Sequence, residues 1–404
     1  MARKKKLEIL RNDPWLEPFE AAITGRHEDV KKKLAEITSG TNGSLTDFAN
    51  AYKYFGLHKE KKGWVFREYA PNATGICLIG TMNGWTPSPE YDLKRLDNGT
   101  WEIHLEADML HDGDLYKMLV RWDGGQGERI PAYATRVVQD EQTKIFSAQV
   151  YAPKRAYKFK NTDFTPDTKP LLIYECHIGM AQQEEKVGSY DEFRTKVLPR
   201  IAADGYNAIQ IMAIQEHPYY GSFGYHVSSF YAASSRFGTP DDLKRLIDDA
   251  HSMGIAVIMD IVHSHAVKNE VEGLGRLDGS YDLYFNSGDR REHPAWDSLL
   301  FDYGKNEVLH FLLSNCKFWQ EEYRFDGFRF DGVTSMLYYD HGLGKAFGSY
   351  QDYYDGGQDK DAIVYLTLAN ILIHEVNKHA ITIAEEMSGM PGLAAVSYTH
   401  LRAH

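Results

Sequence analysis

The sequence predicts an α/β protein in which a helical segment and a small all-β sandwich precede a parallel sheet flanked by helices. Two changes of pattern support this prediction: helical spacing gives way to short strand-like segments, and these give way to alternating strands and helices. With 404 residues, the chain is long enough for two or three domains of roughly 100–200 residues each. We expect domain boundaries that divide the chain into residues 1–58, 59–155, 156–394 and 395–404.

The first segment, residues 1–58, carries helical signals. Asp13-Pro14 is typical of a helix cap followed by a first turn, where proline is tolerated because the backbone N–H has no partner. Apolar side chains then recur at helical spacing between Val30 and Ile37. These signals predict a helical amino-terminal segment.

Short segments rich in β-forming residues follow, and turn residues such as Asn83-Gly84 and Asp123-Gly124 separate them. We expect strands at residues 64–69, 76–79, 101–105, 115–122 and 144–150. Closely spaced short strands are typical of a sandwich. Residues 152–169 are basic and contain proline, and they predict a linker.

From residue 171 onward the pattern alternates between strands and helices. Strands are expected at residues 171–176, 207–213, 255–262, 328–331 and 381–385. Helices are expected between them, at residues 190–203, 239–253, 307–323 and 361–377. Repeated β-α units with Val- and Ile-rich strands predict a parallel sheet whose carboxyl-terminal edge holds the functional residues.

Charge and composition exclude some classes of function. The formal net charge is −12, so nucleic acid is not an expected partner. No signal-peptide core is visible and no run approaches the ~18 apolar residues of a membrane span, so a membrane is not an expected partner either. The three scattered cysteines predict reduced thiols in a cytoplasmic protein. Aromatic residues make up 13% of the chain, which suits carbohydrate binding, although large cores would explain it as well.

Three of the expected parallel strands end in carboxylates, at Asp260, Asp331 and Glu385. A buried carboxylate is costly unless it is paired. Arg329 stands two residues before Asp331, and because alternate residues of a strand share a face, the two side chains can pair. Two carboxyl groups at one mouth are what retaining glycoside chemistry needs. One, kept ionised by the arginine, attacks the anomeric carbon, and the other, less compensated, protonates the leaving oxygen. A purely structural arginine–aspartate bridge is the alternative, but three such ends together favour catalysis.

Histidines and a tyrosine near these positions extend the candidate site. His263 and His265 could bind a metal as a His-x-His pair, but the next two strands offer no further histidine, so we expect none. We interpret His263 as a structural hydrogen-bonding group and His265 as a ligand for a substrate hydroxyl beside Asp331. In the aromatic loop at residues 215–225, Tyr225 is expected to stack on a sugar ring, although plain loop packing would explain it equally well.

Segments around these positions, at residues 260–265, 327–331 and 384–386, are similar to signature regions of the α-amylase superfamily of glycoside hydrolases (glycoside hydrolase family 13). Longer stretches resemble the eukaryotic-like glucan-branching enzymes within it, at residues 212–217, 222–225, 232–240, 322–336 and 381–391. The resemblance runs from about residue 10 to residue 394. It implies a (β/α)8 TIM-type barrel behind a family 48 carbohydrate-binding module.

The resemblance also implies roles for individual residues. Asp331 matches the catalytic nucleophile, Glu385 the general acid/base and Arg329 the arginine beside the nucleophile. The positions implied to bind substrate or line the site are Asp260, His265, Tyr225, His217 and Trp85. The implied reaction cleaves an α-1,4-glucan through a glycosyl–aspartate ester and transfers the chain to a 6-hydroxyl, as in glycogen biosynthesis. This chemistry needs no cofactor and no metal, and its partner is an α-glucan.

Two departures from the family pattern are visible. The residues after Glu386 contain no Asp or Glu, whereas the family has a third catalytic carboxylate after a later strand. Residues 395–404 do not resemble the family at all. The sequence therefore predicts an incomplete barrel of about five strands, in a chain that is aggregation-prone and inactive as it stands.

Two other functions stay open at this level. An α-glucan hydrolase of the same superfamily would use the same carboxylates, since water and a sugar hydroxyl react with the same intermediate. A non-catalytic glucan-binding protein would use the sandwich, with Trp85 as the first candidate unless it packs in the core. The sequence does not indicate the transferred chain length, and we expect a monomer.

Overall fold

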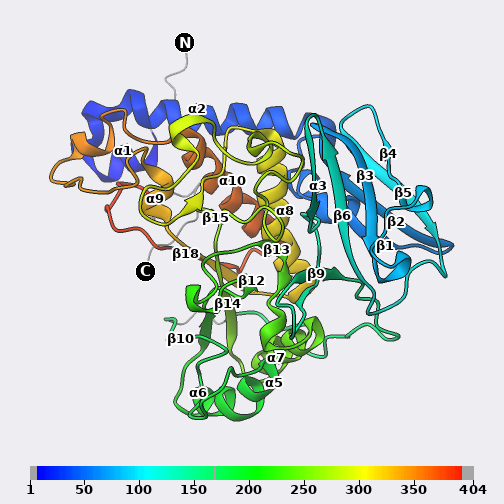
Figure 1. Ribbon diagram of the computed structural model, residues 1–404. Helices are drawn as coiled ribbons and strands as arrows, with labels where there is room; N and C mark the ends of the chain where they lie inside the picture. Colours follow the sequence, from blue (N-terminus) through cyan, green and yellow to red (C-terminus); the bar gives the residue numbers. More distant parts are fainter. Residues whose placement is uncertain (1–6, 167–169, 394–404) are drawn as a thin grey trace.

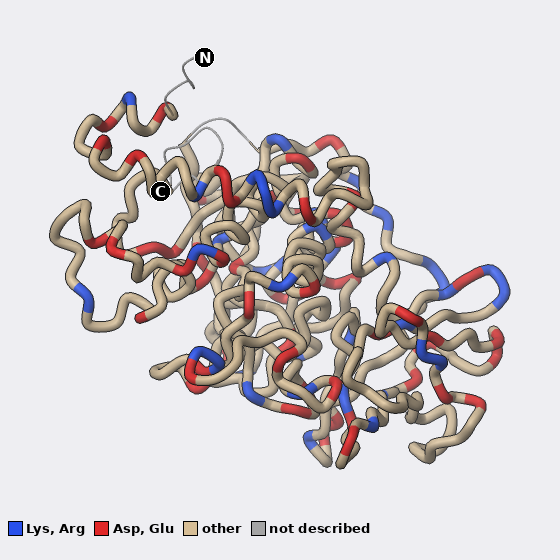
Figure 2. Tube along the Cα trace, turned by 90° about the horizontal axis from the view of Figure 1, so that it is seen from above, with Lys and Arg blue, Asp and Glu red and all other residues tan. Residues whose placement is uncertain are grey.

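The computed structural model describes residues 7–166 and 170–393 (Figure 1). The expected non-family tail at residues 395–404 lies outside the described residues. In Figure 1, helix α2 (Glu20–Ile37) runs across the top, the antiparallel strands lie at the right, and the parallel strands lie in the lower centre. Acidic and basic positions are interspersed along the trace in Figure 2. Among the described residues, no helix is long and apolar enough to cross a membrane.

The amino-terminal segment is helical up to Tyr54, as predicted. Its helices are α1 (Glu8–Asn12), η1 (Pro14–Phe19), α2, η2 (Ser39–Thr41), α3 (Leu45–Phe48) and α4 (Ala51–Tyr54). The Asp13 carboxylate accepts a hydrogen bond from the Trp15 N–H at 3.0 Å, which is the predicted cap, and the turn that follows is a 3-10 helix. Residues 56–58 were also expected to be helical, and this was wrong, because their backbone pairs antiparallel with the next strand.

Two antiparallel sheets form the β-rich part of the chain. The strands are β1 (Gly56–Lys59), β2 (Gly63–Tyr69), β3 (Ala73–Gly80), β4 (Lys94–Arg95), β5 (Thr100–Glu106), β6 (Leu115–Trp122), β7 (Gly125–Arg129), β8 (Val137–Gln139) and β9 (Phe146–Gln149). One sheet has the order β1-β2-β5-β4 and the other β3-β6-β9-β8, with β7 paired to β6. The five expected strands are confirmed. The sequence missed the other four because they are short or rich in Gly and charged residues, and longer neighbours define them.

The expected linker after β9 is anchored to a helix. Asp248 in α7 (Pro240–Ser252) accepts a hydrogen bond from the Tyr157 hydroxyl at 2.7 Å. The same carboxylate accepts from the backbone N–H groups of residues 160 and 161, each at 2.9 Å. One buried carboxylate thus fixes the path of this segment.

Five parallel strands form a separate sheet. In chain order and side by side, they are β10 (Ile173–Cys176), β11 (Ala208–Ile211), β14 (Ala256–Ile261), β17 (Gly327–Phe330) and β18 (Ile381–Ala384). The helices between them include α6 (Leu198–Ala203), α7, α8 (Asn306–Tyr323) and α10 (Lys360–Val376). These elements confirm the predicted α/β architecture with its parallel sheet. The sequence did not predict two short antiparallel pairs in the loops, β12 (Gln215–Glu216) with β13 (Ser229–Ala233) and β15 (Ala266–Val267) with β16 (Ser298–Leu299).

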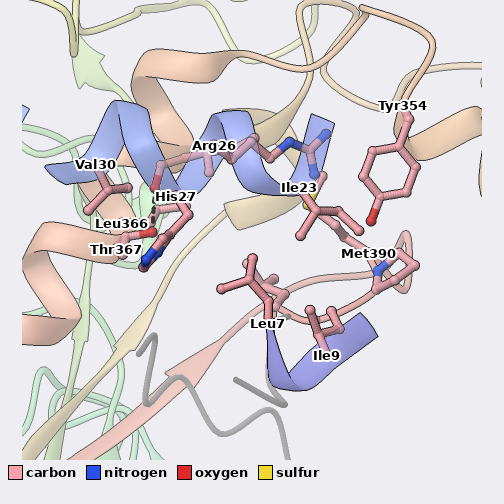
Figure 3. A pocket seen from close by; sticks show the side chains of 14 residues that line it. Leu7, Ile9, Ile23, Arg26, His27, Val30, Tyr354, Leu366, Thr367 and Met390 are labelled. Atoms are coloured by element: carbon pink, nitrogen blue, oxygen red, sulfur yellow. Dashed lines mark hydrogen bonds between the residues drawn. The ribbon is translucent and has the colours of Figure 1, made fainter. Parts of the chain in front are cut away.

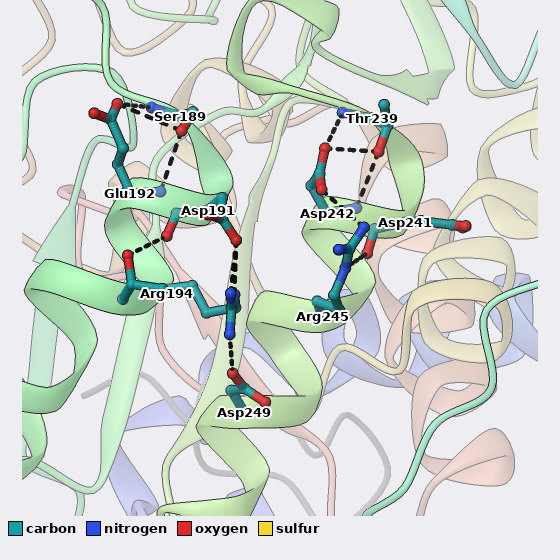
Figure 4. Close-up of polar contacts among 10 residues, drawn as sticks. Ser189, Asp191, Glu192, Arg194, Thr239, Asp241, Asp242, Arg245 and Asp249 are labelled. Carbon is teal, nitrogen blue, oxygen red and sulfur yellow. Dashed lines mark hydrogen bonds and ion pairs between the residues drawn. The ribbon is translucent and has the colours of Figure 1, made fainter.

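Capping boxes begin two of the helices between the parallel strands (Figure 4). At the start of α7, the Thr239 hydroxyl accepts from the Asp242 N–H at 3.2 Å, and the Asp242 carboxylate accepts from the Thr239 N–H at 2.8 Å. Ser189 and Glu192 form the equivalent box at the start of α5 (Tyr190–Glu192). Both boxes satisfy N–H groups that the first helical turn leaves without partners.

Candidate active site

The carboxyl ends of three neighbouring strands bring the predicted acidic residues together. Asp260 lies near the end of β14, Asp331 directly follows β17, and Glu385 directly follows β18. The sheet's hydrogen bonding continues through these ends, because the Asp331 N–H donates to the Ile261 carbonyl at 3.1 Å and the Glu385 N–H to the Phe330 carbonyl at 3.0 Å. Since the ends of parallel strands share one edge, the three carboxyl groups converge there.

Arg329 contacts all three carboxylates. Its Nη1 lies 2.8 Å from Asp260 Oδ1 and 3.0 Å from Asp331 Oδ1, and its Nη2 lies 3.2 Å from Glu385 Oε2. Burial alone would lower the pKa of the guanidinium, but attraction to the carboxylates, Asp260 first, raises it above its ordinary value. The expected pairing with Asp331 is present, and one cation serves three acids.

Burial makes the two aspartates weaker acids than usual. Desolvation raises the pKa of Asp331 to about 6, although the attraction of Arg329 opposes this change. Desolvation likewise raises the pKa of Asp260 to about 7. At pH 7, Asp331 is therefore mostly ionised, and it becomes protonated as the pH falls through 6.

Glu385 differs from the aspartates in its exposure to solvent. Its side chain is 41% exposed, whereas that of Asp331 is 13% exposed and that of Asp260 is fully buried. Besides the contact with Arg329, Glu385 Oε2 accepts a hydrogen bond from the Gly332 N–H at 2.8 Å. The expectation that Glu385 is the less compensated carboxylate was wrong, because the same guanidinium reaches it. Access to solvent is what separates the two candidate reacting groups.

Tyr225, His265 and Ser264 border the carboxylates. The Tyr225 hydroxyl donates to Asp260 Oδ2 at 2.9 Å, and burial together with the Asp260 charge raises its pKa, so it stays protonated. His265 Nε2 donates to the Tyr225 carbonyl at 2.7 Å. Ser264 Oγ lies 2.9 Å from His265 Nδ1 and 3.3 Å from Asp331 Oδ2, and it joins the two residues. Because both nitrogens of His265 have protein partners, its contact with a sugar hydroxyl stays a prediction. Ser264 was not predicted as a site residue, because its only signal in the sequence is its place between two histidines.

His263 has the structural surroundings that the sequence indicated. Its Nε2 donates to Asn315 Oδ1 at 2.9 Å, and its Nδ1 accepts from the Tyr365 hydroxyl at 2.5 Å. Burial lowers its pKa to about 4, so the ring is neutral at pH 7. Over the described part of the chain, no group of three or more His, Cys, Asp and Glu side chains is arranged to hold a metal ion.

His217 does not line the site, contrary to the prediction. Its side chain is fully buried, and its Nδ1 donates to the Gln215 carbonyl at 2.9 Å. Burial lowers its pKa to about 4. The residue lies in an aromatic-rich loop, which suggested substrate contact, but the sequence does not show which ring of such a loop turns inward.

Trp85 lies in the β-rich part of the molecule, on the turn after β3, and its side chain is 39% exposed. Its backbone is left-handed, with φ of 60°, and Lys117 Nζ lies 5.8 Å from the ring centroid. This exposure excludes the alternative that Trp85 packs in the core.

Glu386 organises the loop beside the candidate site. Its carboxylate accepts from the Thr334 hydroxyl at 3.3 Å and from the backbone N–H groups of residues 388–390 at 2.7 to 3.3 Å. Two adjacent glutamates therefore differ in surroundings: Glu386 is saturated by donors from its own loop, whereas Glu385 faces Arg329.

An apolar cavity lies elsewhere, between α2, α10 and residues 390–393 (Figure 3). Its polar groups include Arg26 and the Tyr354 hydroxyl, which points into the cavity and has no partner among the described residues. The described side chains that line it include no carboxylate. This cavity therefore lacks the pair of carboxyl groups that the sheet edge offers.

Two parts of the chain match known protein families. Residues 54–134 match carbohydrate-binding module 48 (isoamylase N-terminal domain). Residues 195–272 match the α-amylase catalytic domain, and they include β11, β14 and the histidines that follow β14.

Curated relatives match nearly the whole chain. The 1,4-alpha-glucan-branching enzyme of Dictyostelium discoideum is 44% identical over 392 residues, which cover 96% of this chain and 57% of that protein. The enzymes of the same name from Aspergillus oryzae and Felis catus are 46% and 45% identical, over 95% and 96% of this chain and 57% and 56% of their own lengths. The chain spans little more than half the length of these relatives.

Solved structures of lower identity show the same fold. A putative alpha amylase from Salmonella typhimurium has a TM-score of 0.63 at 20% identity, over 82% of this chain and 50% of that one. The apo pullulanase from Paenibacillus barengoltzii has a TM-score of 0.64 at 20% identity, over 86% and 56%. With a match to carbohydrate-binding module 48, a match to the α-amylase catalytic domain and 44–46% identity over nearly the whole chain, the chain is similar to the 1,4-alpha-glucan-branching enzymes.

Proposed function

We propose that the protein is a 1,4-α-glucan branching enzyme, which cleaves an α-1,4-glucan and transfers the released chain to a 6-hydroxyl. The observation that carries this proposal is the contact of one guanidinium, Arg329, with Asp260, Asp331 and Glu385 at 2.8 to 3.2 Å. Retaining glycoside chemistry needs two carboxyl groups at one site, and the shared guanidinium places Asp331 and Glu385 at the same edge of the sheet. The identity to branching enzymes supports transfer rather than hydrolysis.

In the first step, Asp331 acts as the nucleophile. Its ionised Oδ attacks the anomeric carbon, while Glu385 gives its proton to the departing glycosidic oxygen. The C–O bond to the leaving chain breaks and an ester to Asp331 forms. Arg329 stabilises the charge on the nucleophile before attack and the charge on Glu385 after it has lost its proton.

In the second step, a glucan 6-hydroxyl replaces water. Glu385, now ionised, takes the hydroxyl proton, and the oxygen attacks the anomeric carbon of the ester. The α-1,6 bond forms, Asp331 leaves as a carboxylate, and Glu385 is protonated again. Neither step uses a metal or an organic cofactor.

The sandwich supplies a second contact with the same polymer. An exposed indole offers an apolar face that suits a pyranose ring. Trp85 has this exposure, whereas the neighbouring Lys117 is buried and pairs with Glu128 at 2.9 Å. We assign Trp85 weak binding of α-glucan away from the reacting bond.

The cellular setting of this proposal is the cytoplasm, where the three free cysteines, all buried, stay reduced. We propose that the protein acts as a monomer. Fractionation of cells and light scattering of the purified protein check these two points.

Analysis of products tests the proposed reaction. Amylose is incubated with the 404-residue chain and with a chimera that continues after residue 393 with the remaining sequence of the Dictyostelium relative. We expect α-1,6 linkages from the chimera, seen as new anomeric proton signals and as chains released by a debranching enzyme. Shortened chains without α-1,6 linkages would identify a hydrolase instead, and retention of glycogen without turnover in both forms would identify a glucan-binding protein.

A further inference from the structure

We propose that Trp296 is a positioning residue for Glu385 and acts on it through the backbone of Gly332. This inference rests on the proposed function, because it concerns the group assigned as acid and base there. It adds two residues to the site that neither sequence reasoning nor the comparisons assign.

Gly332 links the two candidate reacting residues, Asp331 and Glu385. It directly follows Asp331, and its N–H donates to Glu385 Oε2 at 2.8 Å. Its φ of 64° is left-handed, a conformation that glycine adopts at no steric cost. A β-carbon at this position would lie 3.0 Å from Ser264 Oγ and 3.1 Å from Trp296 Cη2. The side chains of Ser264 and Trp296 therefore lie close to the side of Gly332 on which a β-carbon would stand, and they restrict the movement of this turn.

Trp296 is fixed to the same turn by a second contact. Its ring stacks on His293, with centroids 4.0 Å apart and planes 7° from parallel. His293 Nδ1 accepts from the Trp296 N–H at 3.1 Å, and His293 Nε2 donates to Ser335 Oγ at 3.1 Å. Ser335 lies in α9 (Val333–Leu337), which begins directly after Gly332. The loop that carries Trp296 is thus attached to the helix that follows Gly332.

These contacts make the two carboxyl oxygens of Glu385 unequal. The Gly332 N–H and Arg329 Nη2 both contact Oε2. Within residues 7–166 and 170–393, Oε1 has no such partner. Because Oε2 accepts the Gly332 hydrogen bond and faces the guanidinium, we place the proton of the acid form on Oε1. Trp296, by holding the Gly332 amide, thereby determines which oxygen gives its proton to the leaving group.

Amide hydrogen exchange tests the contact on the chain itself. Trp296→Phe keeps a ring for His293 but removes the outer edge that reaches Gly332. The Gly332 N–H should then exchange faster, approaching the rate in Glu385→Ala. Trp122→Phe is the matched control, because Trp122 is also partly buried but packs between Arg129 and Arg276 in the β-rich part. Equal exchange at Gly332 in the two tryptophan variants would overturn the proposal.

Kinetics test the consequence in the branching-competent form. Trp296→Phe should lower kcat on amylose on the order of 10- to 100-fold with little change in KM, because a misplaced acid slows only the bond-breaking step. Transfer from α-maltosyl fluoride, whose leaving group needs no strong acid, should be spared. Equal losses on both donors would show a general structural role and contradict the proposal. If the wild type forms no branches, the proposed function fails, whereas the exchange experiment still decides whether Trp296 holds the partner of Glu385.

Discussion

The β-rich part and the parallel sheet differ in how they present their candidate functional residues. In the β-rich part, antiparallel neighbours are close in sequence, and the candidate binding residue, Trp85, stands on a single turn after β3. In the parallel sheet, the guanidinium cluster needs three strands separated by whole helices, with Asp260 and Glu385 held by a residue of the strand between them.

This difference predicts that substitutions in the two regions will differ in their effect on the fold and on activity. A binding residue on a turn of a stable sandwich can be removed without loss of the fold, because little of the core depends on it. A buried cluster of one cation and three acids responds to any change in one member, because the remaining charges lose their compensation. The predictions below test this contrast, from the largest expected effect to the smallest.

Removal of the nucleophile should have the largest effect. Asp331→Asn keeps the shape of the side chain but cannot form the ester, so branching activity should fall by roughly 10³-fold or more. The assay measures α-1,6 linkages in a branching-competent form, and circular dichroism checks the fold. Turnover close to that of the wild type would remove Asp331 from the mechanism.

Removal of the proton donor should depend on the leaving group. Glu385→Gln should lower activity on amylose by about 10²- to 10⁴-fold, which is the usual contribution of a positioned acid or base. An activated aryl maltoside should lose far less in the bond-cleaving step, since its leaving group departs without a proton. If both donors suffer equally, Glu385 is not the acid.

The pH profile should report the buried aspartate. Because burial raises the pKa of Asp331 to about 6, the nucleophile becomes protonated below that pH. We therefore expect kcat/KM to fall about tenfold per unit on the acid side of an apparent pKa near 6. Ser264→Ala removes a hydrogen bond to the ionised form and should move this limb to higher pH. An acid limb near pH 4 would contradict the assignment.

Loss of a buried hydrogen-bonding ring should destabilise the sheet. His263→Leu leaves the Asn315 and Tyr365 groups without their partner, at a cost of roughly 2–4 kcal/mol in free energy of unfolding. Denaturant titration measures the change. His104→Leu is the control, because that side chain is 60% exposed and should change stability little. Equal effects of the two changes would show that His263 is not a structural link.

Removal of the exposed indole should have the smallest effect. Trp85→Ala should weaken retention in glycogen gels by a few-fold, roughly 1 kcal/mol, because one stacked ring is lost. Thermal stability and the action on short donors should stay as in the wild type. Retention unchanged in the variant would move glucan binding to another part of the surface, and loss of stability would show that Trp85 supports the fold after all.

Local patterns were sufficient for most elements of both regions. Alternation, apolar periodicity and turn residues predicted the long strands and helices, because those signals come from neighbours in the sequence. The same reasoning missed β1 (Gly56–Lys59) and the other short strands, whose structure comes from pairing with a longer partner. The spacing of two residues between Arg329 and Asp331 correctly predicted their contact, since alternate residues along a strand share a face.

What the sequence by itself determined is therefore the chemistry available at each strand end: the three acids, the arginine and the histidines, together with the order of the strands that carry them. The tertiary structure alone decided that one guanidinium contacts all three acids. Register between β14, β17 and β18 brought Glu385 onto the same guanidinium as the aspartates, and burial raised the pKa of Asp331 and Asp260. Packing also turned His217 inward and brought Trp296 against Gly332. Such effects depend on desolvation and on contacts between distant segments, which no local pattern contains.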